Sequence, residues 1–251
     1  MVRTASSSYA IQMARILVIQ HNLDDHLNEL AAPLIEAGLE IDTWDVENAS
    51  APTTPLHEYD GVISLGAIAG VLEEHEHAWM PIERKLFNQA LDLEMPLLGI
   101  CFGSQMLASA AGAEVYKTPT PEVGWTKVHM KPESSNDPIM KALGKDPDVF
   151  HFHYDTFNMP EGAKLYGTTN DINQAFRVGP KAWGVQFHIE VGVAAMHSWF
   201  ATYPKAFEKL GISVEDQKAR TKKNAKAYRE RSIAVAQAFA KEVKKYHNVT
   251  K

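Results

Sequence analysis

The chain has 251 residues, a formal net charge of −6 and 45 % hydrophobic residues, which fits a globular protein with one large α/β domain or two small ones. The acidic balance argues against a general nucleic-acid-binding protein, and no apolar run is long enough to cross a bilayer. The N-terminus lacks the apolar core of a secretory signal. The single cysteine cannot form an internal disulfide, which favours a reducing compartment, most simply the cytoplasm.

Residues 1–13 are Ser-rich and contain no acidic residue. We expect this segment to be a short tail, followed by one domain over residues 14–251. The alternatives are that Met13 is the natural start, or that the segment is a transit peptide, for which it is short.

The first half of the chain alternates between buried strands and helices. Apolar or alternating runs predict strands at residues 15–20, 39–46, 59–66 and 96–100. Helical spacing predicts helices at residues 24–37, 81–93 and 104–111. This order predicts a mostly parallel sheet with helices on both faces.

The second half of the chain has a different pattern. Residues 123–187 contain short strands and frequent turn signals, which indicate separate antiparallel strands or an antiparallel extension of the same sheet. Helical segments follow at residues 193–203 and from 214 to about 246, within a C-terminal helical extension over about 192–251. No internal repeat or linker-like boundary interrupts the chain, so we expect a single domain.

The only cysteine lies in the stretch "PLLGICFGSQ", where a buried strand runs into a G-x-C-x-G turn and a helix. Ligands collect at the carboxyl ends of parallel strands, and this turn is the cysteine form of a nucleophile elbow. The helix N-terminus favours the thiolate and can stabilise an oxyanion. A buried packing role remains the alternative for Cys101, because free cysteines are commonly buried.

A nucleophilic cysteine needs a base and a group that orients the base. The stretch "WGVQFHIEV" predicts a strand ending at Phe187, after which His188 and Glu190 lie two residues apart on one side of the chain. Glu190 can then hold one imidazole nitrogen while the other faces the thiolate of Cys101. The alternative is a surface histidine beside an acidic residue.

Together, "GICFGSQ" and "GVQFHIE" resemble the class I glutamine amidotransferase domain with its Cys-His-Glu triad. The stretches "EVGWTKV", "HFHYDTFNMPEGAKL" and "NQAFRVG" are similar to its stand-alone, GMP-synthase-like branch. The resemblance covers most of the chain and implies a flavodoxin-like α/β fold. It implies cleavage of a γ-glutamyl amide through a thioester on Cys101, with His188 as base and acid and Glu190 as its orienter.

The resemblance also implies roles for residues around the triad. The backbone N–H groups of Phe102 and Ala67 match the two oxyanion donors of the family, and Gly66 matches the first glycine of its Gly-Gly-Pro loop. Gln105 matches a residue that helps hold the glutamyl group. Tyr154 and Asp155 match the loop that contacts the α-amino and α-carboxylate end of the substrate.

The chain departs from the family pattern at two of these positions and at the neighbouring Ile68. Ala67 replaces a glycine, so a loop that needs positive φ there would be strained. Ile68 replaces the usual proline, and Tyr154 stands where synthetase-linked relatives often have glycine. The changes at Ala67 and Tyr154 weaken the case for free glutamine and favour a hydrolase of other γ-glutamyl amides or peptides.

Several functional hypotheses remain open at this point. Water could accept the γ-glutamyl group, or glutamine could be cut and its ammonia passed to a separate synthetase partner, because the chain has no Gly-rich phosphate loop of its own. A non-catalytic binding module on the same fold and a protease- or chaperone-like relative are further alternatives. No cofactor and no metal are expected, and the leaving amine, the partner and the oligomeric state stay undetermined.

Three other segments carry histidines or clustered charge. The stretch "EEHEHAW", residues 73–79, could border the pocket or act as a lid, and its spacing argues against a metal site. His151 and His153 alternate on one predicted strand, so they face the same side. The segment 217–231 is strongly basic, which is typical of a solvated helix face; a docking surface is the alternative.

Overall fold

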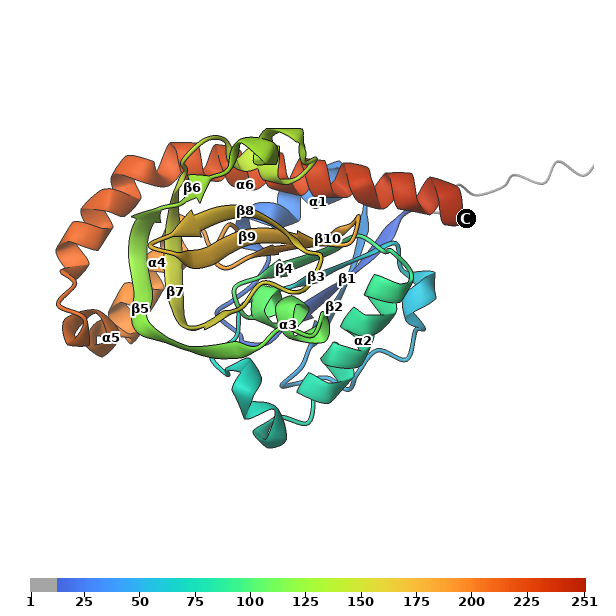
Figure 1. The fold of residues 1–251 in the computed structure, drawn as a ribbon, viewed down its shortest axis with the longest axis horizontal. Helices are drawn as coiled ribbons and strands as arrows, with labels where there is room; N and C mark the ends of the chain where they lie inside the picture. The colour runs from blue at the N-terminus through green and yellow to red at the C-terminus, as the bar shows by residue number, and fades with distance from the viewer. Residues whose placement is uncertain (1–12) are drawn as a thin grey trace, which may run out of the picture.

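The computed structural model describes residues 13–251, so residues 1–12 of the predicted tail lie outside the described residues. An eight-stranded sheet forms its centre, in the order β2-β1-β3-β4-β10-β9-β8-β6 (Figure 1). The neighbouring strands β2, β1, β3, β4 and β10 pair in parallel. This is the strand order of the flavodoxin-like fold, which confirms the predicted fold class.

The strands of the central sheet are β1 (Arg15–Gln20), β2 (Glu40–Asp45), β3 (Gly61–Ser64), β4 (Leu97–Ile100), β6 (His129–Met130), β8 (Lys164–Thr169), β9 (Ile172–Val178) and β10 (Ala182–Val185). The α-helices are α1 (Ala31–Glu36), α2 (Met80–Asp92), α3 (Phe102–Ala110), α4 (Val193–Thr202), α5 (Pro204–Lys209) and α6 (Val214–Thr250). Short 3-10 helices include η1 (Asn28–Leu30) and η3 (Val71–Glu76).

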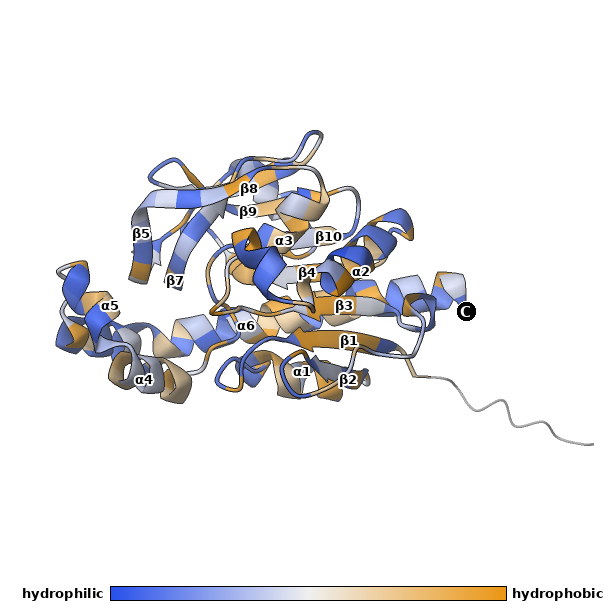
Figure 2. Ribbon diagram, turned by 90° about the horizontal axis from the view of Figure 1, so that it is seen from below, coloured by the Kyte–Doolittle hydropathy of each residue, from blue (hydrophilic) through white to orange (hydrophobic). Residues whose placement is uncertain are grey.

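Successive residues of β1 point to opposite faces of the sheet, as the pleat requires. Ile16 and Val18 pack into the apolar cluster that contains residues of α1 and α6. Leu17 and Ile19 pack into the cluster that contains residues of α2 and α3. Strands β1 and β3 are accordingly apolar between two helical layers (Figure 2). Near-continuous apolar runs are what a sheet covered on both faces needs.

The predicted antiparallel extension is present in two forms. Strands β9, β8 and β6 extend the central sheet antiparallel to β10 and to one another. Strands β5 (Val115–Lys127) and β7 (Asp148–Phe157) form a second, two-stranded antiparallel sheet, with an irregularity between Lys117 and Glu122. One end of this pair lies near α4 and α5 (Figure 1).

The first predicted helix, at residues 24–37, is much shorter in the structure. Residues 22–27 form a loop, η1 follows, and α1 begins only at Ala31. Pro33 is tolerated only in the first turn of a helix, which fits this late start. Asp24 and Asp25 therefore lie in a loop beyond the carboxyl end of β1, where side chains can reach a site.

The C-terminal helices form the predicted helical extension. Helix α6 spans 37 residues and buries Val235, Phe239 and Val243 in the core. Its N-terminal part contacts β5: the Gln217 side-chain oxygen accepts a hydrogen bond from the backbone N–H of Trp125 at 2.9 Å. Figure 1 shows α6 running across the whole width of the molecule.

Among residues 13–251, no helix combines the length and the apolar character that crossing a bilayer requires.

Candidate active site

Cys101 occupies the tight turn between β4 and α3. Its backbone is strained, with φ 51° and ψ −106°, and such outliers cluster at functional sites. Neighbouring glycines make the turn possible, because a Cβ on Gly99 would overlap the backbone of Gly103. A Cβ on Gly103 would in turn overlap the backbone carbonyl of Ser64. The sequence pattern G-x-C-x-G therefore corresponds to a crowded strand–turn–helix elbow.

His188 and Glu190 follow β10, the strand that pairs with β4 on the side away from β3. The His188 Nδ1 lies 2.6 Å from the Glu190 Oε1, and Glu190 Oε2 accepts a hydrogen bond from the Ile189 N–H at 2.8 Å. Both side chains are buried, which leaves Glu190 with two fixed partners and no solvent. The carboxylate therefore fixes the orientation of the imidazole ring.

The electrostatics of the His188 ring depend on its two partners. Burial by itself lowers the pKa of His188, but the charges of Glu190 and Cys101 raise this pKa well above its ordinary value. The ring therefore keeps its proton around neutral pH. A charged imidazole beside a cysteine is the arrangement that favours nucleophilic sulfur chemistry in general.

Asp25 is a buried carboxyl beside this pair. It has an oxygen within 4.8 Å of ligand atoms of both His188 and Glu190, and its Oδ1 has no hydrogen-bond partner among the described residues. Burial, followed by the charge of Glu190, raises the pKa of Asp25 well above its ordinary value. Asp25 is thus a carboxyl that favours its neutral form.

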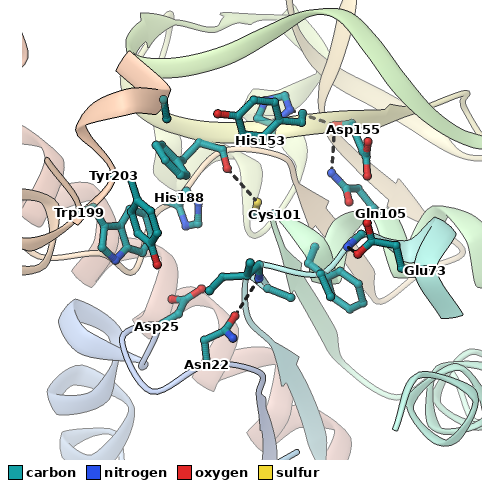
Figure 3. A pocket seen from close by; sticks show the side chains of 18 of the residues that line it. Asn22, Asp25, Glu73, Cys101, Gln105, His153, Asp155, His188, Trp199 and Tyr203 are labelled. Carbon is teal, nitrogen blue, oxygen red and sulfur yellow. Dashed lines mark hydrogen bonds between the residues drawn. The ribbon is translucent and has the colours of Figure 1, made fainter. Parts of the chain in front are cut away.

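A cavity of about 350 Å³ opens above Cys101, within the usual size range of small-molecule sites. In Figure 3, Cys101 lies between His188, Trp199 and Tyr203 on one side and Gln105, Asp155 and Glu73 on the other. The predicted site residues that line the cavity are Ala67, Cys101, Phe102, Gln105, Tyr154, Asp155 and His188. Gly66 and Glu190 do not line the cavity; Gly66 precedes the lining residue Ala67, and Glu190 contacts the lining residue His188.

Two residues beside Cys101 combine a place in the cavity wall with a free backbone donor among the described residues. The N–H groups of Ala67 and Phe102 have no hydrogen-bond acceptor within residues 13–251, although both residues line the cavity. Ala67 does not adopt positive φ, so the alanine causes no strain in this loop. The Asn22 side chain also holds the loop, because its Oδ1 accepts from the Ile68 N–H at 2.8 Å.

Polar side chains gather at the opposite end of the cavity. Gln105 donates from its amide to the Asp155 carbonyl at 3.0 Å, and Lys117 Nζ lies 3.2 Å from the Asp155 carboxylate. Glu73, from the stretch "EEHEHAW", lines the cavity and accepts from the Gly70 N–H at 3.0 Å. A carboxylate and an ammonium at one end suit a zwitterionic amino-acid group.

His151 and His153 face the same side of β7, as their alternation predicts. His153 Nε2 lies 3.0 Å from Glu122 Oε2 and 3.4 Å from His151 Nδ1, while His153 Nδ1 bonds the Asp155 carbonyl at 3.0 Å. Burial, and then the positive charges of His153 and His188, lower the pKa of His151 well below its ordinary value. The described contacts of this cluster brace the wall that carries Asp155.

The wall beyond His188 is aromatic. Trp199 of α4 packs edge-on against the His188 ring, with ring centroids 5.0 Å apart. The Trp199 and Phe152 ring centroids are 5.8 Å apart. Tyr203 follows α4, and its ring centroid lies 5.7 Å from that of Phe152. The Tyr203 hydroxyl donates a hydrogen bond to the Asp24 carboxylate at 3.3 Å. Helices far along the chain therefore complete the cavity.

Several cavity residues escape the sequence interpretation. Asn22, Asp24 and Asp25 follow the carboxyl end of β1, and that position is a signal that could have found them. The predicted helix over residues 24–37 obscured it. Lys117 and Trp199 carry no local signal, because their roles depend on how β5 and α4 pack.

The fold and the cysteine elbow define the class of protein: a flavodoxin-like α/β protein with a cysteine at a nucleophile elbow beside a buried His–Glu pair. The family model for glutamine amidotransferase class-I matches residues 18–201. The chain belongs to this family.

Two relatives illustrate the similarity in sequence. The chain is 40 % identical over 101 residues to a GMP synthase (glutamine-hydrolyzing) of Porphyromonas gingivalis, a match that covers 39 % of this chain and 20 % of the relative. It is 31 % identical over 150 residues to one subunit of the GMP synthase (glutamine-hydrolyzing) of Sulfurisphaera tokodaii, covering 56 % and 72 % of the two chains. The match to the first relative thus spans about a fifth of that protein's length.

Solved structures agree on the fold. A glutamine amidotransferase from Thermotoga maritima superposes with a TM-score of 0.82 at 31 % identity, over 91 % of this chain and 99 % of that chain. A glutamine amidotransferase from Methylobacillus flagellatus superposes with a TM-score of 0.79 at 21 % identity, covering 92 % and 96 % of the two chains. The second likeness supports the fold alone.

Proposed function

We propose that this protein hydrolyses a γ-glutamyl amide through a γ-glutamyl thioester on Cys101. The observation that carries the proposal is the buried His188–Glu190 pair beside a strained cysteine elbow. Two residues of the same cavity wall, Ala67 and Phe102, have backbone N–H groups without an acceptor among residues 13–251. Family membership supports the same chemistry.

In the first half of the reaction, the Cys101 thiolate attacks the γ-carbonyl carbon of the substrate. The carbonyl oxygen takes up the negative charge and accepts hydrogen bonds from the N–H groups of Ala67 and Phe102. His188, which holds its proton around neutral pH, donates that proton to the leaving nitrogen. The amine departs and the γ-glutamyl thioester remains on Cys101.

In the second half, the now neutral His188 removes a proton from a water molecule, whose oxygen attacks the thioester carbonyl. The same backbone donors stabilise the second tetrahedral intermediate. Its collapse breaks the C–S bond, releases glutamate and returns Cys101 to the thiolate beside a protonated His188. Glu190 keeps the ring in one orientation throughout.

The two ends of the cavity suggest how the substrate lies. Asp155 and Lys117 suit the α-ammonium and α-carboxylate of the glutamyl group, at the end where Gln105 braces the wall. The leaving amine then lies near His188, Trp199 and Tyr203. An aromatic wall at this position suits an amine larger than ammonia, which favours a γ-glutamyl compound other than glutamine.

A second candidate is a glutaminase that passes ammonia to a separate synthetase partner. The similarity to the Sulfurisphaera tokodaii GMP synthase chain favours it. In this version Cys101, His188 and Glu190 act as above and only the fate of the released nitrogen differs.

The test is release of glutamate by the full chain, with free glutamine compared against a panel of γ-glutamyl amides and peptides. The control is Cys101→Ala. We expect one γ-glutamyl compound to be hydrolysed at least about tenfold faster than glutamine, a difference that a single pocket contact can supply. Turnover of glutamine as the best substrate would favour the synthetase-linked version. Turnover that persists in Cys101→Ala would refute the thioester mechanism.

A further inference from the structure

A buried polar chain lies behind the loop that carries Ala67. His21 follows β1, Glu83 lies on α2 and Ser64 ends β3; all three are at most 1 % exposed. His21 Nδ1 lies 2.9 Å from the Gly66 carbonyl oxygen, and its Nε2 lies 2.9 Å from Glu83 Oε2. The Ser64 hydroxyl donates to Glu83 Oε1 at 2.7 Å.

These partners determine where the protons are. A carbonyl oxygen can only accept, so His21 Nδ1 must carry a hydrogen and donate it to Gly66. Ser64 occupies one oxygen of Glu83, and the other oxygen shares a proton with His21 Nε2. Glu83 therefore fixes the ring in the orientation that directs Nδ1–H at the loop.

The carbonyl of Gly66 and the N–H of Ala67 belong to one planar, trans peptide unit, so they point in opposite directions. Holding the carbonyl on the protein side therefore directs the N–H to the other side, where Ala67 lines the cavity. A hydrogen bond to a peptide carbonyl also strengthens the N–H of the same unit as a donor.

The His21 ring contacts the second donor residue as well. Its centroid lies 4.8 Å from the Phe102 ring and 4.8 Å from the Trp79 ring. The imidazole thus packs against the rings of Phe102 and Trp79 while its Nδ1 holds the Gly66 carbonyl.

We propose that His21, held by Glu83, is a positioning residue that fixes and polarises the Gly66–Ala67 peptide as an oxyanion donor. The inference rests on the proposed function, because an oxyanion forms only in acyl transfer. It assigns a task to a buried His–Glu pair that the reaction itself does not touch. It also explains how the loop holds its shape without the glycine and proline that the family pattern has at Ala67 and Ile68.

The kinetic test compares His21→Leu with His21→Asn. Leucine removes the donor, whereas the asparagine amide can offer an N–H close to the position of Nδ1. We expect kcat to fall at least about tenfold in His21→Leu, with KM changed less than about twofold, because an oxyanion contact acts in the transition state. His21→Asn should recover most of the lost kcat. A purely structural role would affect both variants alike.

His247→Leu is the matched control, because His247 also pairs with a buried carboxylate, Asp60, at 3.0 Å. That pair lies beside the start of β3, at the opposite end of the strand from the loop. This variant should lose stability without a change in kcat. An unchanged kcat in folded His21→Leu would overturn the proposal.

A second readout needs no turnover. In the ¹⁵N spectrum of the wild-type protein, His21 Nδ1 should be protonated and hydrogen-bonded, and the Ala67 amide signal should shift in His21→Leu but stay near its place in His21→Asn. A bare Nδ1 in the wild type would overturn the inference even if His21→Leu does not fold. If no γ-glutamyl amide is hydrolysed but these signals are seen, the proposed function is wrong, whereas the inference that His21 fixes the Gly66–Ala67 peptide is supported.

Discussion

Asp25 is the side chain of the site whose ionisation conflicts most with its surroundings. Its carboxyl is buried, lies beside the negatively charged Glu190 and has one oxygen without a hydrogen-bond partner among the described residues. Only the nearby His188 opposes the rise of its pKa. Because the folded protein holds a proton on Asp25 that the unfolded chain loses, the free energy of unfolding decreases as the pH rises.

The sign of this effect follows from the two pKa values. In the unfolded chain Asp25 loses its proton at about pH 3.9, while in the folded protein its pKa is raised well above that value. Between the two, the folded state binds more protons, so the free energy of unfolding falls by up to about 1.4 kcal/mol per pH unit. Above the folded pKa the loss is complete.

We predict that Asp25→Asn removes this pH dependence. Asparagine has the same shape and no proton to lose, and its amide can donate toward Glu190. Its free energy of unfolding should match that of the wild type at about pH 4 and exceed it by at least about 1 kcal/mol at about pH 7. Urea unfolding at a series of pH values measures this. Asp24→Asn, at an exposed neighbour, should parallel the wild type; parallel curves for Asp25→Asn would contradict the account.

Residues of the site differ in how far they can be predicted. Cys101, His188 and Glu190 are predictable because each follows a strand whose apolar pattern is clear, and short spacing fixes their geometry. Asp25 and His21 follow an equally clear strand, but a helical pattern with an early acidic residue hides the loop. Lys117 and Trp199 reach the cavity only through tertiary packing, which no local pattern records.

At the scale of elements, the elbow depends on how closely β4, β3 and α3 approach. Gly99 and Gly103 are required because backbone atoms occupy the space of their side chains. Helix α3 starts at Phe102, earlier than the sequence predicts, and the same packing explains this. The helix begins directly after Cys101, and its first residue, Phe102, lines the cavity.

We predict that Gly103→Ala lowers the free energy of unfolding by about 3 kcal/mol, because its Cβ would meet the backbone carbonyl of Ser64, which cannot move aside alone. Helix propensity would by itself favour alanine by about 1 kcal/mol. Chemical denaturation at constant pH measures the loss.

Gly112→Ala is the matched control, since this glycine ends α3 in open space with φ 86°. Only backbone strain opposes alanine there, and the loss should be about 1 kcal/mol. Equal losses in the two variants would mean that the close approach at the elbow is not the cause.

The elements differ in how well the sequence predicts them. Buried strands of the parallel sheet are predictable because continuous apolar runs need cover on both faces. The β5–β7 pair is less predictable from the sequence, because an irregularity between Lys117 and Glu122 breaks the alternation of side chains between the two faces of β5. Tertiary contacts, which no local pattern records, determine that this pair forms its own sheet and does not join the central one.

At the scale of the whole molecule, the cavity joins segments far apart in the sequence. The loops after β1, β3 and β4 supply one side, β7 supplies Asp155, and α4 supplies Trp199. Helix α6 reaches the back of the site, where burial and then the charge of Glu190 raise the pKa of its buried Tyr228 well above the ordinary value. Through Trp199 and Tyr203, the C-terminal extension therefore contributes to the cavity wall.

The same helix carries the basic segment 217–231, whose docking role stays a prediction. Several of its charges have partners in this chain: Lys218 pairs with Glu215, Arg229 with Glu29, and Arg231 donates to the Asp148 carbonyl. Lys222 and Lys223 remain exposed on its surface. These internal pairings favour the solvated-face interpretation.

We propose above that Cys101 carries the γ-glutamyl group during turnover. The most direct measurement is the intact mass of the protein, quenched in acid during turnover of its fastest γ-glutamyl substrate, followed by peptide mapping. We predict an added γ-glutamyl group on the peptide that contains Cys101, and no such group in Cys101→Ala. Glutamate release without any adduct in the wild type, together with undiminished release by Cys101→Ala, would contradict it.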